Sequence, residues 1–265
     1  MKKNLWTTLA VLPLFAVCAA ETGKADAKPA AQPAAAVQQA KPEWKDNTVV
    51  AGSRKAVFGK NGIIIIQAGD RSVLNVKPYF CIHTPEKKSY YADPHNRPFK
   101  ITVSNDGKSV QYAGDMTIEG KTWQAYTLKA ELTPEGLIHI TINWQRPPQE
   151  LNWKFSVFLA MDSTYEALGG SLLKVNKDSV TLPATHDPDP KKQKLGEFWR
   201  GGVFRCIFLA NSPADAFAII GSQKNNFAGL WVNRNNLFRN LSFTSYPNQK
   251  RTDMEFDIDL RGGLQ

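Results

Sequence analysis

Two loops of the sequence hold side chains that could carry acid–base chemistry. Segment 90–98 places His95 among an aspartate, an asparagine, an arginine and two tyrosines, and segment 185–190 places His186 next to Asp187. Imidazole titrates near neutral pH and a neighbouring carboxylate can orient it, so both loops contain the groups that general acid–base catalysis uses. The alternative is that both loops are simple turns, because proline, asparagine and aspartate are common turn residues.

Glu197 begins a third candidate segment, 197–202, which reads Glu-Phe-Trp-Arg-Gly-Gly. Its carboxylate could act with that of Asp93 or Asp187 as the carboxylate pair of a glycoside hydrolase. The alternative is that Glu197 and Arg200 are solvated, while the phenylalanine between them fills the core. If the protein is an enzyme, the candidate catalytic residues are His95, His186, Asp93, Asp187 and Glu197.

Segment 231–240 combines a tryptophan with asparagines and arginines, which are residue types that bind sugars. An aromatic face can stack on the apolar face of a sugar ring, and planar amide and guanidinium groups can hydrogen-bond its hydroxyls. We expect such residues to converge on one edge or face of the domain as a glycan-binding surface. The competing interpretation is that Trp199 and Trp231 belong to the core. The candidate ligand-binding residues are Tyr90, Tyr91, Asn96, Arg97, Trp199, Arg200, Trp231, Asn233 and Arg234.

Several motifs that mark catalysis or cofactor binding do not occur in the sequence. It has no glycine-rich phosphate loop, no His-Glu-x-x-His or paired Cys-x-x-Cys metal motif, and no Gly-x-Ser-x-Gly nucleophile elbow. Asp187 and Asp189 have the spacing of loop residues whose side-chain oxygens bind calcium. A calcium ion takes about six to eight oxygens, and two aspartates are not enough to predict such a site. We therefore expect no cofactor and no metal.

The N-terminus has the layout of a secretory signal peptide. Lys2 and Lys3 precede an apolar run, 5–17, which is too short to span a hydrocarbon core of about 30 Å. Small residues follow, and they predict cleavage after Ala20. The alternative, lipid attachment at Cys18, would favour a small residue before the cysteine, where the sequence has a branched valine. We expect export to the periplasm or the extracellular space, with no transmembrane segment in the mature chain.

Residues 21–42 consist mainly of alanine, proline, glutamine and lysine. Such a segment cannot bury enough apolar surface to fold, so we expect a disordered linker before a domain that covers 43–265. The chain as a whole has a net charge of +9, and its densest basic cluster, 191–194, contains no aromatic residue. This pattern indicates a solvated loop, and we do not expect nucleic acid as a partner.

The domain shows the period-two alternation of β-strands. Ile138, Ile140 and Ile142 alternate with polar residues, and tight turns are predicted at 105–108 and 133–136. No long segment shows the spacing of apolar residues that marks an amphipathic helix. The sequence therefore predicts an all-β fold with little helix, a large antiparallel β-sandwich of roughly sixteen to eighteen strands. Two smaller sandwiches, divided near 147–148 or 183–190, are the alternative.

The segment 132–138, the hairpin at 175–180 and the aromatic-rich closing strands resemble parts of large galactose-mutarotase-like β-sandwich domains. The resemblance covers most of residues 48–260. It implies a place among the domains that accompany polysaccharide lyases and glycoside hydrolases. Mutarotases use histidines and a carboxylate, but no motif in this sequence matches those positions, so the resemblance assigns no catalytic residue here.

Export, the β-sandwich pattern and the aromatic content together favour a non-catalytic glycan-binding protein. The chain contains 7 Trp, 7 Tyr and 14 Phe, which is ample for stacking on sugar rings. One alternative is a carbohydrate-active enzyme, a hydrolase, lyase or epimerase, that uses a site of histidine and carboxylate residues. The other is a structural envelope protein without a ligand.

Overall fold

A computed structural model describes residues 41–83, 89–92, 100–118, 120–146, 152–160, 172–175, 178–181, 197–201, 206–212, 215–221, 228–232, 239–245 and 252–261. All of them belong to one compact unit. The expected signal peptide and most of the expected linker lie outside the described residues.

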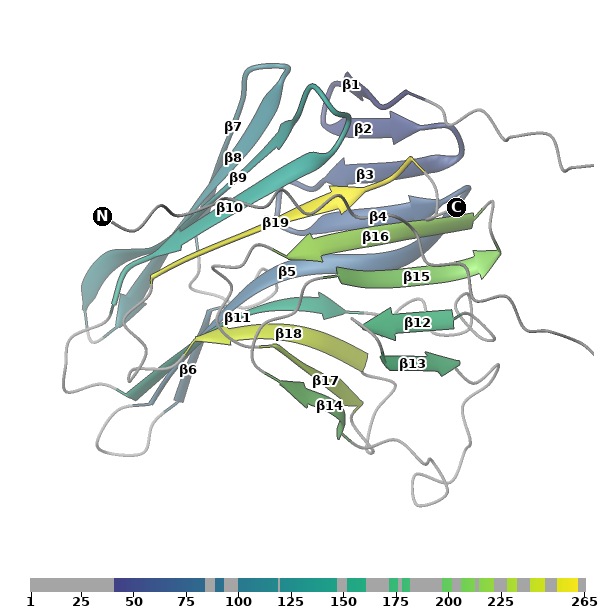
Figure 1. Cartoon of the computed structure of the whole chain (residues 1–265). Helices are drawn as coiled ribbons and strands as arrows, with labels where there is room; N and C mark the ends of the chain where they lie inside the picture. The colour runs from purple at the N-terminus through teal and green to yellow at the C-terminus, as the bar shows by residue number, and fades with distance from the viewer. Residues whose placement is uncertain are drawn as a thin grey trace, which may run out of the picture. The chain divides into compact units, whose positions relative to one another are not determined.

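Nineteen strands form two antiparallel sheets in the described part of the chain (Figure 1). Sheet A has ten strands: β1 (Glu43–Lys45), β2 (Thr48–Ala51), β3 (Arg54–Phe58), β4 (Ile64–Ala68), β5 (Arg71–His83), β6 (Ser89–Ala92), β11 (Asn152–Ala160), β14 (Glu197–Gly201), β17 (Ala228–Val232) and β18 (Arg239–Ser245). Its strand order is β1-β2-β3-β4-β5-β11-β18-β17-β14, and β6 pairs with β5.

Sheet B has nine strands: β7 (Lys100–Asn105), β8 (Ser109–Ile118), β9 (Lys121–Leu132), β10 (Ile138–Trp144), β12 (Leu172–Val175), β13 (Asp178–Thr181), β15 (Cys206–Ser212), β16 (Asp215–Gly221) and β19 (Asp253–Asp259). Its strand order is β13-β12-β15-β16-β19-β10-β9-β8-β7.

The prediction of a large all-β sandwich is confirmed. The described residues form no helix, and hence none that is long and apolar enough to cross a membrane. The nineteen strands slightly exceed the expected number, and strands of three or four residues such as β1 and β6 are too short to show a clear alternation.

Strand pairing across the chain favours one sandwich over two. β5 pairs with β11, on the other side of residues 147–148, and β10 pairs with β19, on the other side of residues 183–190. Both candidate boundaries therefore fall inside sheets that are continuous across them.

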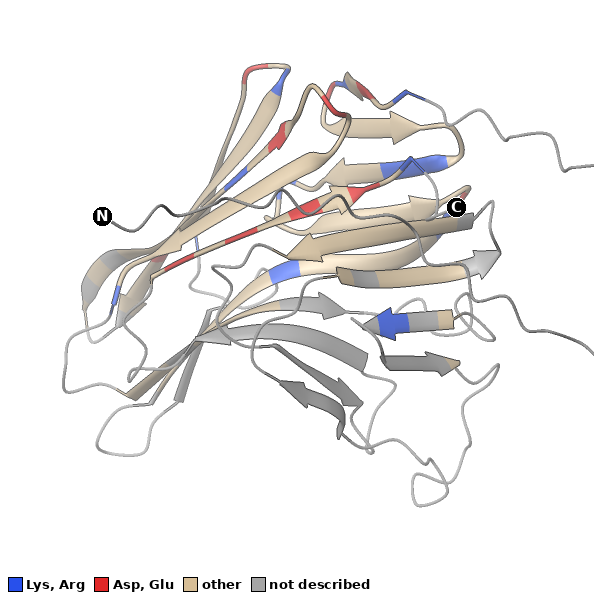
Figure 2. Ribbon diagram, viewed as in Figure 1, with Lys and Arg blue, Asp and Glu red and all other residues tan. Residues whose placement is uncertain are grey.

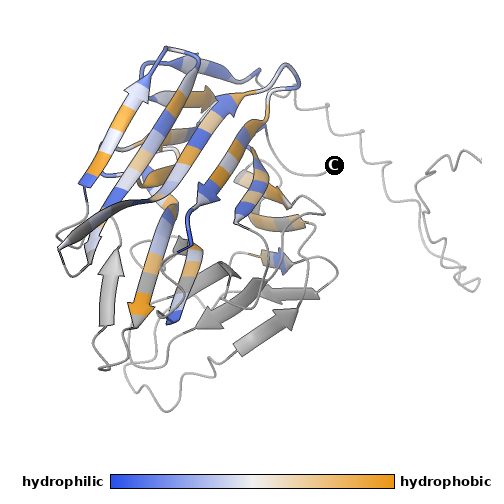
Figure 3. Cartoon of the chain, turned by 90° about the vertical axis from the view of Figure 1, so that its left-hand side faces the viewer, coloured by the Kyte–Doolittle hydropathy of each residue, from blue (hydrophilic) through white to orange (hydrophobic). Residues whose placement is uncertain are grey.

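Phe155 lies at the centre of the aromatic core between the two sheets. Its ring, from β11, is 4.7 Å from that of Trp144 on β10 and 6.0 Å from that of Tyr126 on β9. All three side chains are buried. Bands of apolar and polar residues alternate along the described strands in Figure 3, as expected for strands with one face in a core. The buried bands of the two sheets meet in a single cluster.

A buried arginine links the sheets by hydrogen bonds. Arg54 of β3 is 8% exposed and donates from Nη1 to the carbonyl oxygen of Ala216 on β16 at 2.6 Å. Its Nη2 donates to the carbonyl oxygen of Arg261 at 2.8 Å. The Arg261 guanidinium in turn donates to both carboxylate oxygens of Asp259 and to the carbonyl oxygen of Glu135. These contacts join β3, β16, the end of β19 and the turn between β9 and β10.

The turn predicted at 105–108 is present between β7 and β8. Gly107 has a φ of 78°, which glycine adopts without a steric penalty. The Asp106 carboxylate accepts hydrogen bonds from the backbone N–H groups of Lys108 and Ser109 at 2.8 and 2.6 Å. These bonds hold the pKa of the Asp106 carboxyl below its ordinary value. The local sequence therefore sets this turn through the carboxylate and the glycine together.

Candidate functional site

The described residues contain only part of the sites expected from the sequence. Eight of the candidates lie outside them: Asp93, His95, Asn96, Arg97, His186, Asp187, Asn233 and Arg234. The others belong to strands of sheet A. Tyr90 and Tyr91 are in β6, Trp231 is in β17, and Glu197, Trp199 and Arg200 are in β14.

Strand pairing brings Glu197 and Trp231 directly opposite each other at the β14 end of sheet A. The row of paired residues continues across the sheet to β5, and we call it the Trp231 row. It consists of Glu197, Trp231, Asn240, Ala160 and Asn75. With about 4.8 Å between neighbouring strands, it spans about 20 Å. Trp231 and Asn240 belong to one segment of the sequence, whereas Asn75 lies far away along the chain and no local pattern links it to them.

Trp199 belongs to a different row from Trp231. It pairs with Leu230, and this Trp199 row continues through Leu241 and Leu159 to Val76. Val76 is fully buried in the core, whereas Asn75 at the end of the Trp231 row is half-buried. A register shift between Glu197 and Trp199 separates the two rows on β14. Such bulges re-aim the residues of an edge strand.

Arg200 begins a third row, which also ends at a polar residue. It pairs with Gly229, and the row continues through Ser242 and Phe158 to Lys77, which is half-buried. The Trp231 and Arg200 rows together place a carboxylate, two aromatic residues, two amides, a hydroxyl and two cationic residues on five adjacent strands.

Tyr90 and Tyr91 lie further away in the same sheet. They pair with Ile82 and Cys81 of β5, on the edge of β5 opposite β11. Four strands, β5, β11, β18 and β17, separate β6 from β14, which corresponds to about 24 Å at the usual strand spacing. The expected convergence of the tyrosines with both tryptophans on one glycan-binding surface stays a prediction. Of the two tryptophans, the register favours Trp231, because the Trp199 row ends at the buried Val76.

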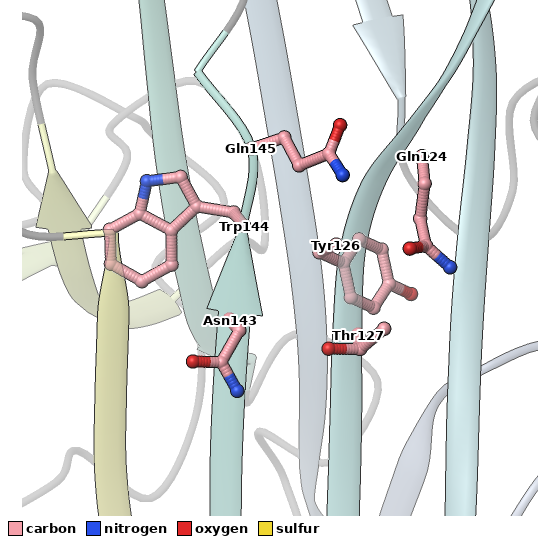
Figure 4. Close-up of a pocket in the computed structure, with 6 residues that line it drawn as sticks. All are labelled: Gln124, Tyr126, Thr127, Asn143, Trp144 and Gln145. Carbon is pink, nitrogen blue, oxygen red and sulfur yellow. The ribbon is translucent and has the colours of Figure 1, made fainter.

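A small hollow lies over sheet B where β9 and β10 meet near residues 124 and 145. Its volume is about 210 Å³, and its lining residues are Gln124, Tyr126, Thr127, Asn143, Trp144 and Gln145 (Figure 4). We call it the amide hollow. The alternation placed Asn143 on the polar face of its strand, but no sequence signal pointed to the three amides as a group.

An imidazole–carboxylate pair lies elsewhere on sheet B. His139 Nδ1 is 2.7 Å from Asp257 Oδ1, and both side chains are about 30% exposed. Asp257 belongs to a run of alternating acidic residues along β19, which Figure 2 shows in red. A side-chain pair this exposed stabilises a fold by less than about 1 kcal/mol. Among the described residues, no group of three histidine, cysteine or acidic residues could hold a metal ion.

Comparisons with known proteins relate the chain to solved structures only. No protein-family model and no curated protein matches it. The alpha-N-acetylgalactosaminidase NagBb from Bifidobacterium bifidum, solved as a complex with GalNAc, superposes on 82% of the chain with a TM-score of 0.51 and 11% identity. The match spans 36% of NagBb, so the chain corresponds to about a third of that protein. A crystal structure of a protein designated HI1317 matches over 80% of the chain and 92% of its own length, with a TM-score of 0.41 and 7% identity. At this level of identity, the likeness to NagBb shows a shared fold.

Proposed function

We propose that the protein is an exported β-sandwich that binds a glycan through sheet A without transforming it. The Trp231 row carries this proposal. It aligns an aromatic residue with an acidic residue and two amides on neighbouring strands. Stacking on the aromatic ring would orient a sugar, and the amides would then select its hydroxyls.

Two further observations support a carbohydrate ligand. The half-buried Lys77 and Tyr79 alternate on β5 with the buried Pro78 and Phe80, so a described polar face runs beside Asn75 along the same strand. In addition, the fold is shared with part of NagBb, which is named as an N-acetylgalactosaminidase and was solved with GalNAc.

The proposal is tested with a glycan array, followed by calorimetry on any glycan that binds. Trp231→Ala and Asn240→Ala should each weaken binding at least tenfold while the melting temperature changes little. The matched control is Gln111→Ala, which removes an exposed amide from β8 of the other sheet. Failure of every glycan to bind, or equal binding by Trp231→Ala and the unmodified protein, would overturn the proposal.

One observation favours an enzyme as the second candidate function. Glu197 lies directly opposite Trp231, which would place a carboxylate beside a stacked sugar ring. A hydrolase would need a second carboxylate, for which Asp93 and Asp187 are the candidates from the sequence. Product analysis on each bound glycan separates the two functions. An enzyme would release product that Glu197→Gln does not, whereas a binding protein leaves the glycan intact.

A further inference from the structure

The amide hollow has the chemistry of a binding site for an uncharged polar molecule. Gln124, Asn143 and Gln145 are exposed and carry primary amides, and Thr127 adds a hydroxyl. Each primary amide offers two donors and an acceptor, so the lining can donate to and accept from the same ligand. Burial raises the pKa of the Tyr126 phenol, and all six lining residues are neutral.

The backbone beneath the hollow is held by several contacts. Asp115 pairs with Gln124 while Gly114 pairs with Tyr126, so that Ala125 is the extra residue of a β-bulge. The N–H of Gln145 donates to the carbonyl oxygen of Ala125 at 3.1 Å, which ties the end of β10 to this bulge. A bulge of this kind changes the direction of neighbouring side chains, here on both sides of Ala125.

The aromatic residues at the hollow are held by the core. The ring of Trp144 stacks on Phe155 with centroids 4.7 Å apart, and in Figure 4 its indole extends away from the other five side chains. Thr127 and Asn143 are directly paired on β9 and β10, so their side chains stand next to each other. The backbone that carries the polar groups of the hollow is therefore held by strand pairing and by core packing.

Two half-buried carboxylates lie beside the amides. Asp115 is the partner of Gln124 on β8, and Asp253 is the partner of Asn143 on β19. Carboxylates accept hydrogen bonds from hydroxyl groups and repel anions. These two carboxylates therefore favour a neutral polyhydroxylated ligand over an acidic one.

We infer that the amide hollow is a second carbohydrate subsite, which takes one uncharged sugar ring and rejects uronic acids. A volume of about 210 Å³ is below the usual range of drug-sized ligand pockets, about 300–1,000 Å³, and suits a single ring. The inference rests on the proposed function only in its ligand class, a glycan. The hollow belongs to sheet B, whereas the Trp231 row belongs to sheet A.

The test is a nuclear magnetic resonance titration of the full chain with methyl glucoside, methyl galactoside and methyl N-acetylgalactosaminide. We expect at least one of them to shift the side-chain amide signals of Gln124, Asn143 and Gln145, with millimolar affinity. Methyl glucuronide should bind several-fold more weakly. Each of Gln124→Ala and Asn143→Ala should weaken binding about fivefold, since each removes hydrogen bonds to the ligand. Gln111→Ala is the control and should leave binding unchanged.

Two variants separate this site from the proposed site on sheet A. Trp231→Ala should leave the shifts of the hollow unchanged even if it abolishes glycan binding on sheet A. The inference is overturned if none of the neutral glycosides shifts these signals, if the glucuronide binds as tightly as the neutral sugars, or if the side-chain amide of Gln145 still shifts with unchanged affinity in a Gln124→Ala/Asn143→Ala double variant. Loss of these shifts in Trp231→Ala would also overturn it.

Discussion

The guanidinium of Arg54 on sheet A donates a hydrogen bond of 2.6 Å to the carbonyl oxygen of Ala216 on sheet B. A second bond from the same group reaches the carbonyl oxygen of Arg261 at 2.8 Å. Arg54 is only 8% exposed, and its guanidinium is thus hydrogen-bonded to backbone carbonyl oxygens of β16 and of the segment after β19. Burying a charge in this way is tolerated only while its hydrogen bonds are made.

We predict that Arg54→Met lowers the free energy of unfolding by about 3 kcal/mol. Methionine keeps the apolar stem but leaves two carbonyl groups without this donor, and each such loss costs about 1–3 kcal/mol. Urea unfolding followed by fluorescence gives the value. Lys100→Met, at an exposed position on β7, is the control and should change stability by less than about 0.5 kcal/mol. Equal effects of the two substitutions would contradict the role of Arg54 as a link between the sheets.

The register of sheet A predicts different outcomes for the substitution of Trp199 and of Trp231. Trp199 shares a row with the buried Val76, and Trp231 shares one with the half-buried Asn75. Trp199→Ala should therefore cost about 3–5 kcal/mol of stability, as expected for a large core residue. Trp231→Ala should leave the melting temperature nearly unchanged. Thermal unfolding of both variants measures the difference, and a large loss of stability in Trp231→Ala would exclude it from a binding surface.

Asp106 predicts a local dependence of stability on pH. Its folded-state pKa lies below the ordinary value because the N–H groups of Lys108 and Ser109 bind the charged form. A lowered folded-state pKa stabilises the fold above the pKa of the unfolded chain, and this contribution is lost as the pH falls through the folded-state value. Asp106→Ala should therefore be less stable than the unmodified protein at pH 7, with the difference vanishing in acid. Equal differences at pH 7 and pH 2.5 would show that the carboxylate charge plays no part.

The N-terminal sequence predicts a mature protein that begins at Glu21. Basic residues, a short apolar run and small residues before the cut form the pattern that signal peptidase recognises. N-terminal sequencing of the protein from the envelope or secreted fraction should begin at Glu21. A lipid-modified Cys18 or a retained Met1 would contradict export by this route.

Local sequence determined the strands and turns of this protein. The alternation at 138–142 predicted three buried isoleucines, and all three are at most 1% exposed. The Asn-Asp-Gly-Lys segment predicted a turn, which Asp106 and Gly107 form through a side-chain hydrogen bond and a positive φ. Both features arise within a few residues, because a pleated strand alternates its faces and a tight turn needs specific backbone angles.

Only the tertiary structure decided which strands far apart in the sequence pair, and in what register. β5 pairs with β11, and β14 pairs with β17, across long stretches of chain. The alternation of apolar and polar residues does not distinguish these partners from the other strands. A shift by one residue would exchange the two faces of a strand, and hence the neighbours of every side chain. The Trp231 row and the amide hollow depend on that choice. The meeting of Glu197 with Trp231 is thus a property of long-range packing, which local sequence does not encode. Asn143 instead meets Thr127 across the β9–β10 hairpin, whose register the predicted turn at 133–136 helps to set.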